Sequence, residues 1–165
     1  MRMDFLSPFG WLTLISHEGR LIYCNWRHPE CEKKLLRIYS HLKDTQSYED
    51  ENILTETCRQ LEEYFCGHRK DFDIPYQLIG TEFQKRIWEK LKLIGYGETV
   101  SYKELSKMAV QDNAVRAVAH ACGANPLAII LPCHRVIASN GSLGGYTGGI
   151  DKKISLLNLE KRVII

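Results

Sequence analysis

The sequence predicts an α+β protein: a small N-terminal α/β domain with a short antiparallel sheet, followed by a mainly helical C-terminal domain with a helix-turn-helix. Three observations lead to this prediction. Strand-like runs lie near the N-terminus, a helical pattern follows in the middle, and two short capped helices lie close together later in the chain. The chain has 165 residues, 44% of them hydrophobic, so it can bury a core. We expect the two domains to span residues 1–78 and 79–165.

The first element is a predicted hairpin. Residues 9–15 and 21–26 are rich in β-prone side chains, and residues 16–19 between them have the composition of a turn. Further along, residues 72–78 predict one more strand, interrupted by Pro75.

A long helix is predicted between these strands. Ser47 opens it and Asp50, three residues later, completes the looser form of the capping box. Gly67 is suited to end it, because glycine tolerates the left-handed conformation of a C-cap. The apolar face between these ends consists of Ile53, Leu54, Thr57, Leu61, Tyr64 and Phe65.

The second half of the chain opens with another helix, over residues 82–93. Thr81 and Gln84 form its capping box. The apolar residues of this helix recur at helical spacing and form one face, made of Phe83, Ile87, Trp88 and Leu91.

Two short helices then follow in the helix-turn-helix pattern. Ser101 caps the first, which runs through Met108 with that side chain facing inward. Residues 112–113 cap the second, which runs over residues 114–122 and ends at Gly123.

The second of these helices is crowded with alanine and has two interpretations. It is either a helix packed closely against its neighbours or a recognition helix whose small face approaches DNA while Arg116 projects. The net charge of +2 does not decide between them, since it is too small to mark a nucleic-acid protein by itself.

The distribution of apolar residues and cysteines indicates the cellular compartment and whether a metal is bound. No apolar stretch approaches the roughly 20 residues that span a bilayer, and no signal-type apolar run follows Met1. We therefore expect a cytoplasmic protein without a membrane partner, acting as a monomer, with its six cysteines reduced. Cys24, His28 and Cys31 lie close in sequence, but no second ligand cluster with zinc-site spacing follows, so we expect no metal.

The most informative segment is residues 132–136, Pro-Cys-His-Arg-Val. It follows the apolar run 127–131, which resembles a buried strand, and Pro132 would stop the ladder there. The thiol of Cys133 is thus delivered to a fixed point at the end of a buried segment. A thiol is a strong nucleophile only as thiolate, and the adjacent His134 is a candidate base.

Together with other motifs, this segment resembles the O6-alkylguanine-DNA alkyltransferases, in particular their bacterial members. The similarity is continuous from about Gly80 to Glu160, and a looser similarity begins at residues 7–10. The motifs that carry it, in order, are residues 80–84, Trp88, 96–102, 116–118, 125–126, 132–136, 144–149 and Glu160.

The resemblance implies a DNA-repair activity. Proteins of this family move the alkyl group of O6-alkylguanine, and more weakly of O4-alkylthymine, onto a cysteine that is not regenerated, so each molecule acts once. The partner is duplex DNA, entered from the minor groove, and no organic cofactor takes part. The damaged base must first rotate out of the stack, at a cost of roughly a few kcal/mol.

By the same resemblance, Cys133 is the acceptor and His134 its base, acting through a water. Glu160 holds the far imidazole nitrogen, and Asn125 fixes the active-site turn. Tyr102 lies by the phosphate 3′ of the lesion and supplies a proton to the leaving guanine. The remaining pocket residues would be Val136, Tyr146, Thr147 and Gly148, with Tyr146 and Thr147 as wall and as donors toward O6.

The resemblance also assigns the DNA contacts. The helix that opens near Ala114 enters the minor groove with Ala117 on its small face. Arg116 fills the gap left by the flipped base, where a planar guanidinium can replace part of the lost stacking. Apart from the resemblance, the charge of basic residues such as Lys103, Lys107 and Arg135 suggests that they help hold phosphates.

Two positions depart from the common family pattern in the pocket. Thr147 stands where many members carry serine, which we expect to narrow the pocket slightly. Gly148 stands where some members carry a larger residue, which predicts a roomier pocket and acceptance of bulky adducts such as O6-benzylguanine.

Three other functions remain as alternatives. The first is a non-catalytic alkyltransferase-like protein that only binds damage, although Cys133, His134 and Glu160 are all present. The second is a transcription regulator, for which the alanine-rich helix offers few base-reading side chains. The third is a Cys/His hydrolase, which would turn over an ester or peptide and need an oxyanion hole.

Overall fold

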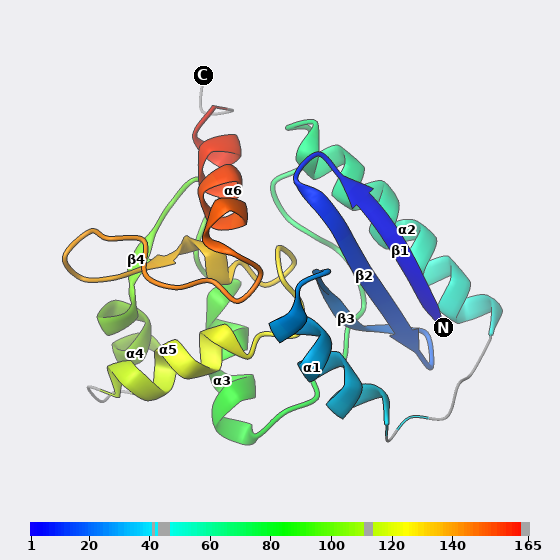
Figure 1. The fold of residues 1–165 in the computed structure, drawn as a ribbon, viewed down its shortest axis with the longest axis horizontal. Coiled ribbons are helices and arrows are strands. Elements are labelled where there is room, and N and C mark those ends of the chain that lie inside the picture. Colours follow the sequence, from blue (N-terminus) through cyan, green and yellow to red (C-terminus); the bar gives the residue numbers. More distant parts are fainter. Residues whose placement is uncertain (41, 43–46, 111–113, 163–165) are drawn as a thin grey trace.

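The computed structural model describes residues 1–40, 42, 47–110 and 114–162. Its first half is built on an antiparallel sheet with strand order β1–β2–β3 (Figure 1). The strands are β1 (Arg2–Ser7), β2 (Gly10–His17) and β3 (Arg20–Trp26). The predicted α+β class is confirmed, and the predicted hairpin corresponds to β2 and β3. Strand β1 was not predicted as a separate element.

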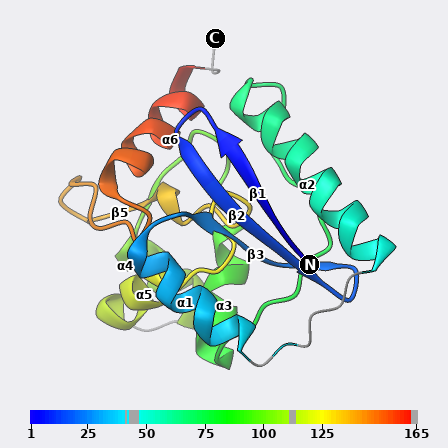
Figure 2. The ribbon, with the colours of Figure 1, turned by 45° about the vertical axis from the view of Figure 1, so that its right-hand side comes forward.

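Two helices accompany this sheet. The long helix α2 (Tyr48–Phe65) covers one face of it, and α1 (Pro29–Tyr39) lies beside β3, toward the helices of the second half (Figure 2). The Ser47 hydroxyl accepts a hydrogen bond from the Asp50 N–H (3.1 Å), as predicted for the start of α2. Gly67 follows the helix with a φ of +78°, the left-handed conformation that glycine tolerates. Helix α1 was missed, although a proline in its first turn is typical of a helix start.

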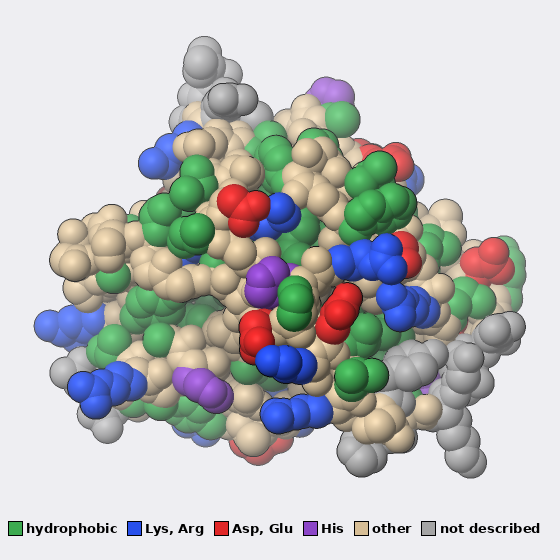
Figure 3. All heavy atoms as spheres, in the orientation of Figure 1, with side chains coloured by type: hydrophobic (Ala, Val, Ile, Leu, Met, Phe, Trp, Pro, Cys, Tyr) green, Lys and Arg blue, Asp and Glu red, His purple; other side chains and the backbone are tan. Residues whose placement is uncertain are grey.

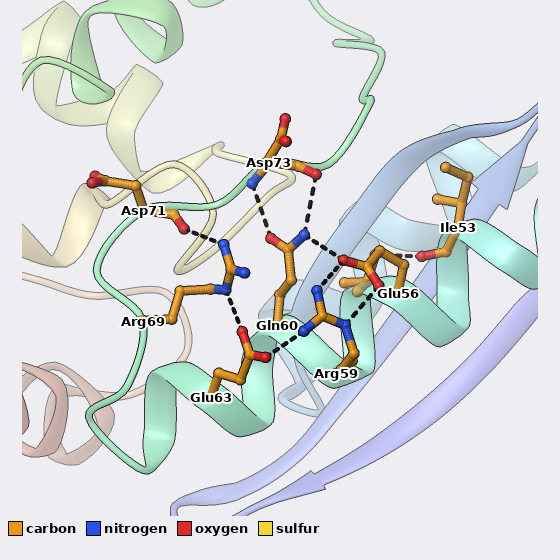
Figure 4. A network of polar contacts seen from close by, with 9 residues as sticks. Ile53, Glu56, Arg59, Gln60, Glu63, Arg69, Asp71 and Asp73 are labelled. Atoms are coloured by element: carbon orange, nitrogen blue, oxygen red, sulfur yellow. Dashed lines mark hydrogen bonds and ion pairs between the residues drawn. The ribbon is translucent and has the colours of Figure 1, made fainter.

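A polar network holds the C-terminal half of α2 to the chain that follows it (Figure 4). The side-chain amide of Gln60 is buried and pairs with the backbone of Asp73 through N–H to O contacts of 2.9 and 3.1 Å. Glu63 pairs with Arg69 (2.7 Å) and also with Arg59. Because the side chain of Gln60 is buried, its two hydrogen bonds fix the last turns of α2 more firmly than the more exposed ion pairs do.

Helices make up most of the second half. In chain order its elements are α3 (Glu82–Leu91), β4 (Val100–Ser101), α4 (Tyr102–Val110), α5 (Val115–Gly123), the 3₁₀ turn η1 (Cys133–Arg135), β5 (Val136–Ile137) and α6 (Ile150–Arg162). Helices α3, α4 and α5 pack against one another, and β4 pairs in parallel with β5.

The predicted helix starts largely agree with this part of the structure. Thr81 and Gln84 form the predicted capping box, and the Ser101 hydroxyl accepts the Glu104 N–H (3.1 Å) at the start of α4. Met108 was expected to face inward but is 38% exposed. The predicted caps at residues 112–113 lie outside the described residues.

Two predicted strands do not form. Residues 72–78 make only an isolated bridge from Tyr76 to Leu21, and residues 127–131 only one from Leu127 to Cys24. Both bridges lie on the outer edge of β3. Beyond Leu127 the chain turns, and Ile129 has a φ of +73°, a conformation that a strand does not contain. The run is apolar because it is buried, not because it is extended.

The core is continuous between the two halves. One cluster of buried side chains joins Leu12 and Trp26 of the sheet to Trp88 of α3 and Leu156 of α6. No described helix combines the length and apolar character needed to cross a membrane.

Candidate active site

Cys133 lines a cavity of about 250 Å³. The turn η1 begins at this residue, whose exposed fraction is 7%. The cavity is lined from α4, α5, η1 and the loop before α6, by Tyr102, Ala119, Cys122, Gly123, Cys133, Gly145, Tyr146 and Thr147. The thiol can thus be reached through this cavity, and helix α5 forms part of its lining.

Asn125 holds the segment that leads to the thiol. Its side-chain nitrogen donates to the sulfur of Cys133 (3.2 Å) and to the carbonyl of Leu131 (2.8 Å). Its side-chain oxygen accepts the N–H of Leu127 (3.0 Å). The backbone carbonyl of Asn125 accepts a hydrogen bond from the side chain of Asn25 of β3 (3.0 Å), which links this segment to the sheet.

Behind the thiol, His134 and Glu160 form a buried pair. The distance from His134 Nε2 to Glu160 Oε1 is 2.7 Å, and both side chains are fully buried. Since an ionised carboxylate only accepts, Nε2 carries a proton and Nδ1 is left as an acceptor in the neutral ring. Among the described residues, Nδ1 has no hydrogen-bond partner.

Glu160 receives further donors that sequence reasoning did not foresee. Arg135 donates through Nε to Oε2 and through Nη2 to Oε1, both at 2.9 Å. The hydroxyl of Tyr64 donates to Oε1 (2.7 Å), and the N–H of Gly97 donates to Oε2 (3.2 Å). Burial alone would raise the pKa of Glu160, but the donors on His134 and Arg135 outweigh it and lower this pKa to about 2.

The position of Arg135 corrects the prediction that it holds DNA phosphates. Its side chain is buried, and besides Glu160 it donates to the carbonyl of Ile94 (2.6 Å). A guanidinium already engaged in this way has a structural role, because its removal would leave Glu160 as a buried charge with fewer donors.

Groups around the thiol of Cys133 oppose the effect of its burial on its pKa. Burial raises the pKa of Cys133, while the Asn125 hydrogen bond and the ammonium groups of Lys153 and Lys34 act to lower it. Lys153 is fully buried and donates to the carbonyls of Val136 (2.6 Å) and Gly145 (3.3 Å). These two lysines were missed, because nothing in the spacing of the sequence links α1 or the start of α6 to the thiol.

Two tyrosines line the cavity and remain protonated. Burial raises the pKa of Tyr102 to about 12 and that of Tyr146 well above its ordinary value. The Tyr146 oxygen accepts the indole N–H of Trp26 (3.2 Å), which leaves its own proton for another acceptor. Both phenols are therefore possible proton donors at neutral pH.

Other predicted pocket residues lie differently. The Thr147 hydroxyl donates to the carbonyl of Gly123 (2.7 Å), so its hydrogen is not directed at a substrate. Val136 is buried and is not among the residues that line the cavity. Gly148 also lies outside that lining, and a Cβ on it would meet Trp26 Cδ1 at 2.1 Å. Its missing side chain makes room for an indole, so the prediction of a roomier pocket is wrong.

The start of α5 carries the residues predicted to contact DNA. Ala114 precedes the helix without a side-chain cap bond, and Arg116 and Ala117 are exposed. One turn further, Ala119 lines the cavity, so this helix connects the surface to the thiol. Figure 3 shows Lys and Arg side chains at separate places on this face and not as one continuous patch.

The suggested metal ligands near the N-terminus make other contacts. His28 caps α1 by accepting the N–H of Glu30 (3.3 Å), and the Cys31 thiol donates to Asn25 (3.4 Å). In the described part of the chain, no three potential ligand side chains come together as a metal site would require.

Comparison with protein families divides the chain into two matched regions. Residues 5–78 match the family model described as "6-O-methylguanine DNA methyltransferase, ribonuclease-like domain". Residues 82–162 match the one described as "6-O-methylguanine DNA methyltransferase, DNA binding domain".

Comparison with individual proteins agrees with this. The chain is 45% identical over 156 residues to the methylated-DNA–protein-cysteine methyltransferase of Methanosarcina acetivorans, covering 94% of this chain and 95% of that protein. The crystal structure of the Mycobacterium tuberculosis O6-methylguanine methyltransferase superposes with a TM-score of 0.80 at 38% identity, over 99% of this chain and 94% of that one. A structure of the M. tuberculosis protein in complex with DNA gives a TM-score of 0.79 at 39% identity, over 97% and 92%. The chain therefore belongs to the 6-O-methylguanine DNA methyltransferase family.

Proposed function

We propose that this protein repairs O6-alkylguanine, and more weakly O4-alkylthymine, by taking the alkyl group onto the sulfur of Cys133. DNA is its partner, and the finer assignment is duplex DNA carrying an alkylated base, approached from the minor groove. The single observation that carries the assignment of the acceptor is a thiol that faces a cavity while a buried His134–Glu160 pair lies behind it.

The lesion must reach a buried thiol that lines a cavity, so the damaged nucleotide has to leave the stack. Helix α5 supports this step, because it exposes Arg116 and Ala117 at its start and lines the cavity with Ala119. Small side chains let the helix approach a groove only about 6 Å wide. Arg116 then occupies the gap in the stack, and Tyr102 lies next to the phosphate 3′ of the flipped nucleotide.

The transfer itself is a displacement at carbon. The S–H proton of Cys133 passes through a water to Nδ1 of His134, and the sulfur attacks the alkyl carbon. An S–C bond forms as the C–O6 bond breaks, and the electron pair of that bond leaves on the guanine oxygen. Glu160 stabilises the imidazolium formed on His134, as a carboxylate does in other Cys/His pairs.

The leaving guanine needs a proton or a hydrogen-bond donor. Tyr102 is the proposed donor, and its pKa of about 12 means that the phenol holds its proton until the oxygen becomes basic. Tyr146 forms the cavity wall with a second phenol. Asn125 keeps the sulfur in place through its bond to Sγ. The product thioether is stable, so each molecule reacts once.

The test is a stoichiometric transfer assay. Purified protein is mixed with duplex DNA that carries one radiolabelled O6-methylguanine, and the labelled peptide is identified by mass spectrometry. We expect label on Cys133, at no more than one methyl per protein. Tight binding without transfer would support the damage-binding alternative, and a lack of binding would reject DNA repair for this chain.

We further propose that residues 1–78 and 79–165 are the two domains and that the protein acts as a cytoplasmic monomer. The ends of the two matched family regions, at residues 78 and 82, support the boundary. The free state of the six cysteines supports a reducing compartment. Size-exclusion chromatography with light scattering tests the monomer, which a mass near 38 kDa, twice the chain mass of 19.0 kDa, would contradict.

A further inference from the structure

A tyrosine of the N-terminal half reaches the proposed catalytic pair. Tyr64 lies on α2, and the sequence pattern predicts it only as part of that helix's apolar face. In the structure its hydroxyl donates to Oε1 of Glu160 on α6, at 2.7 Å, with both side chains fully buried. This is the same oxygen that accepts Nε2 of His134.

The position of Tyr64 is well determined by its surroundings. Its ring packs edge-on against Tyr96, with centroids 6.0 Å apart, and in a tilted arrangement against Phe72, at 5.5 Å. The last turns of α2 are held by two hydrogen bonds between the buried side chain of Gln60 and the backbone of Asp73 (Figure 4). The hydroxyl therefore points at Glu160 from a rigid support, not from a mobile side chain.

The shared oxygen makes the donors compete. Each hydrogen bond to Oε1 takes part of the carboxylate's negative charge, so less of it is available to stabilise a proton on His134. A carboxylate that held the imidazolium too strongly would keep His134 protonated, and a protonated ring cannot accept the proton of Cys133. A weaker hold of Glu160 on protonated His134 therefore favours the neutral imidazole, which can accept the proton of Cys133.

We propose that Tyr64 is a positioning residue that weakens the hold of Glu160 on a protonated His134 and thereby keeps the imidazole neutral and able to accept a proton from Cys133. This inference rests on the proposed function and adds to it a role for a tyrosine of the N-terminal half in a reaction whose acceptor, base and proton donor lie in the second half.

Other charged or titratable groups also face this pair. Arg135 of η1 donates to Glu160 and disfavours charge on His134. Lys153 of α6 also disfavours charge on His134, while its ammonium donates to the carbonyls of Val136 and Gly145. Tyr96 packs on Arg135, with the guanidinium carbon 5.6 Å from the ring centroid. All of these remain when only the Tyr64 hydroxyl is removed. Burial lowers the pKa of His134 and Glu160 opposes this effect, which sets the direction expected for a change at Tyr64.

The test compares Tyr64→Phe with Tyr23→Phe. Tyr23 is a matched control, because its buried hydroxyl also donates to a buried acceptor, the carbonyl of Cys31 at 2.8 Å, without contacting Glu160. The pKa of His134 is measured by NMR titration of its ring, and the rate of transfer from methylated duplex DNA is measured against pH.

In Tyr64→Phe we expect the pKa of His134 to rise by about one pH unit, within the range that one charge-assisted hydrogen bond supports. The acid limb of the transfer rate should move upward with it, and in Tyr23→Phe both should stay unchanged. An unshifted His134 in folded Tyr64→Phe, or an equal shift in both variants, would overturn the proposal.

If Tyr64→Phe does not fold, 3-fluorotyrosine at position 64 serves instead. The fluorinated phenol is a stronger donor of similar size, so the pKa of His134 should fall, and an unchanged or higher value would overturn the proposal. The NMR readout needs no substrate. A failure of methyl transfer in the wild-type protein would therefore reject the proposed function without affecting this measurement.

Discussion

The two sides of Cys133 differ in how their polar groups are used. Behind the thiol, Glu160 takes donors from His134, Arg135, Tyr64 and Gly97 in a fully buried setting. In front of it, the phenols of Tyr102 and Tyr146 face a cavity of about 250 Å³ and keep their protons. At the back, the carboxylate of Glu160 is surrounded by hydrogen-bond donors, whereas the front keeps phenol donors free for a substrate. Changes at the back should thus alter stability and pH dependence, and loss of the Cys133 thiol or of the Tyr102 hydroxyl in front should alter the transfer chemistry.

The largest effect is expected at the front, from removal of the thiol. Cys133→Ala should abolish transfer of the methyl label while leaving the fold intact, because the side chain becomes smaller by one atom in a place that opens to a cavity. Cys122→Ala is the matched control, since Cys122 lines the same cavity and burial raises its pKa well above the usual value. We expect it to retain most of the transfer. Label appearing on Cys122 in the Cys133→Ala variant would contradict this difference.

The next largest effect is expected at the back, from Glu160→Gln. The change leaves the buried guanidinium of Arg135 without its anionic partner, and breaking a buried pair costs about 3–5 kcal/mol. Urea unfolding at pH 7 measures the loss. A cost below about 1 kcal/mol would mean that the back of the site does not hold charge as the contacts indicate.

The same pair of proteins gives a pH test. The pKa of Glu160 is lowered from its ordinary 4.5 to about 2 in the folded chain, so its contribution to stability is complete above pH 4.5 and is lost as the pH falls toward 2. The wild-type advantage over Glu160→Gln should therefore be constant between pH 5 and 7 and shrink below pH 4.5. A stability advantage that grows below pH 4.5 would show that the pKa of Glu160 is not lowered in the folded chain.

A smaller effect, on stability, is expected at Gly148, which packs against Trp26 and does not line the cavity. Gly148→Ala would place a Cβ 2.1 Å from Trp26 and should lower the free energy of unfolding by about 1–3 kcal/mol through overpacking. Gly145→Ala is the matched control for stability, because a Cβ there has no described atom within 4 Å. Thermal unfolding of both variants tests the comparison, and equal melting temperatures would contradict it.

The smallest effect is expected at Thr147. Thr147→Val removes the hydroxyl that donates to the carbonyl of Gly123, which costs about 1 kcal/mol for an ordinary hydrogen bond. Lys34 donates to the same carbonyl and should soften the loss. Thr147→Ser keeps the hydroxyl and should unfold like the wild type in urea, so a larger loss in the serine variant would point to the methyl group instead.

Sequence reasoning located the elements that have local signals. Capping residues mark the starts of α2, α3 and α4, and each of these caps forms as expected. The failures have a common cause. The runs 72–78 and 127–131 are apolar and β-prone, but burial against the edge of β3 accounts for that composition without a full strand.

The site shows the same limit. The pairing of His134 with Glu160 lies within a family pattern, so the sequence suggested it before the geometry was known. The contributions of Tyr64, Lys34 and Lys153 depend on which distant faces meet after folding. Spacing predicts the face of a helix on which a residue lies, but not which remote residue that face will contact. Arg135 was misplaced for this reason, because a basic residue in a DNA-binding protein suggests the surface, whereas the fold buries it.

The conformation of Ile129 has a consequence for engineering this protein. A buried β-branched residue with a φ of +73° is strained by an amount on the order of 1–3 kcal/mol. It lies between the edge of the sheet and the turn that holds the thiol, so the strain is compensated by the packing on both sides. Substitution by glycine or asparagine would relax the backbone and lose apolar contacts. The net change in stability on substitution at position 129 therefore depends on which of these two effects is larger, and the reacting groups stay unchanged.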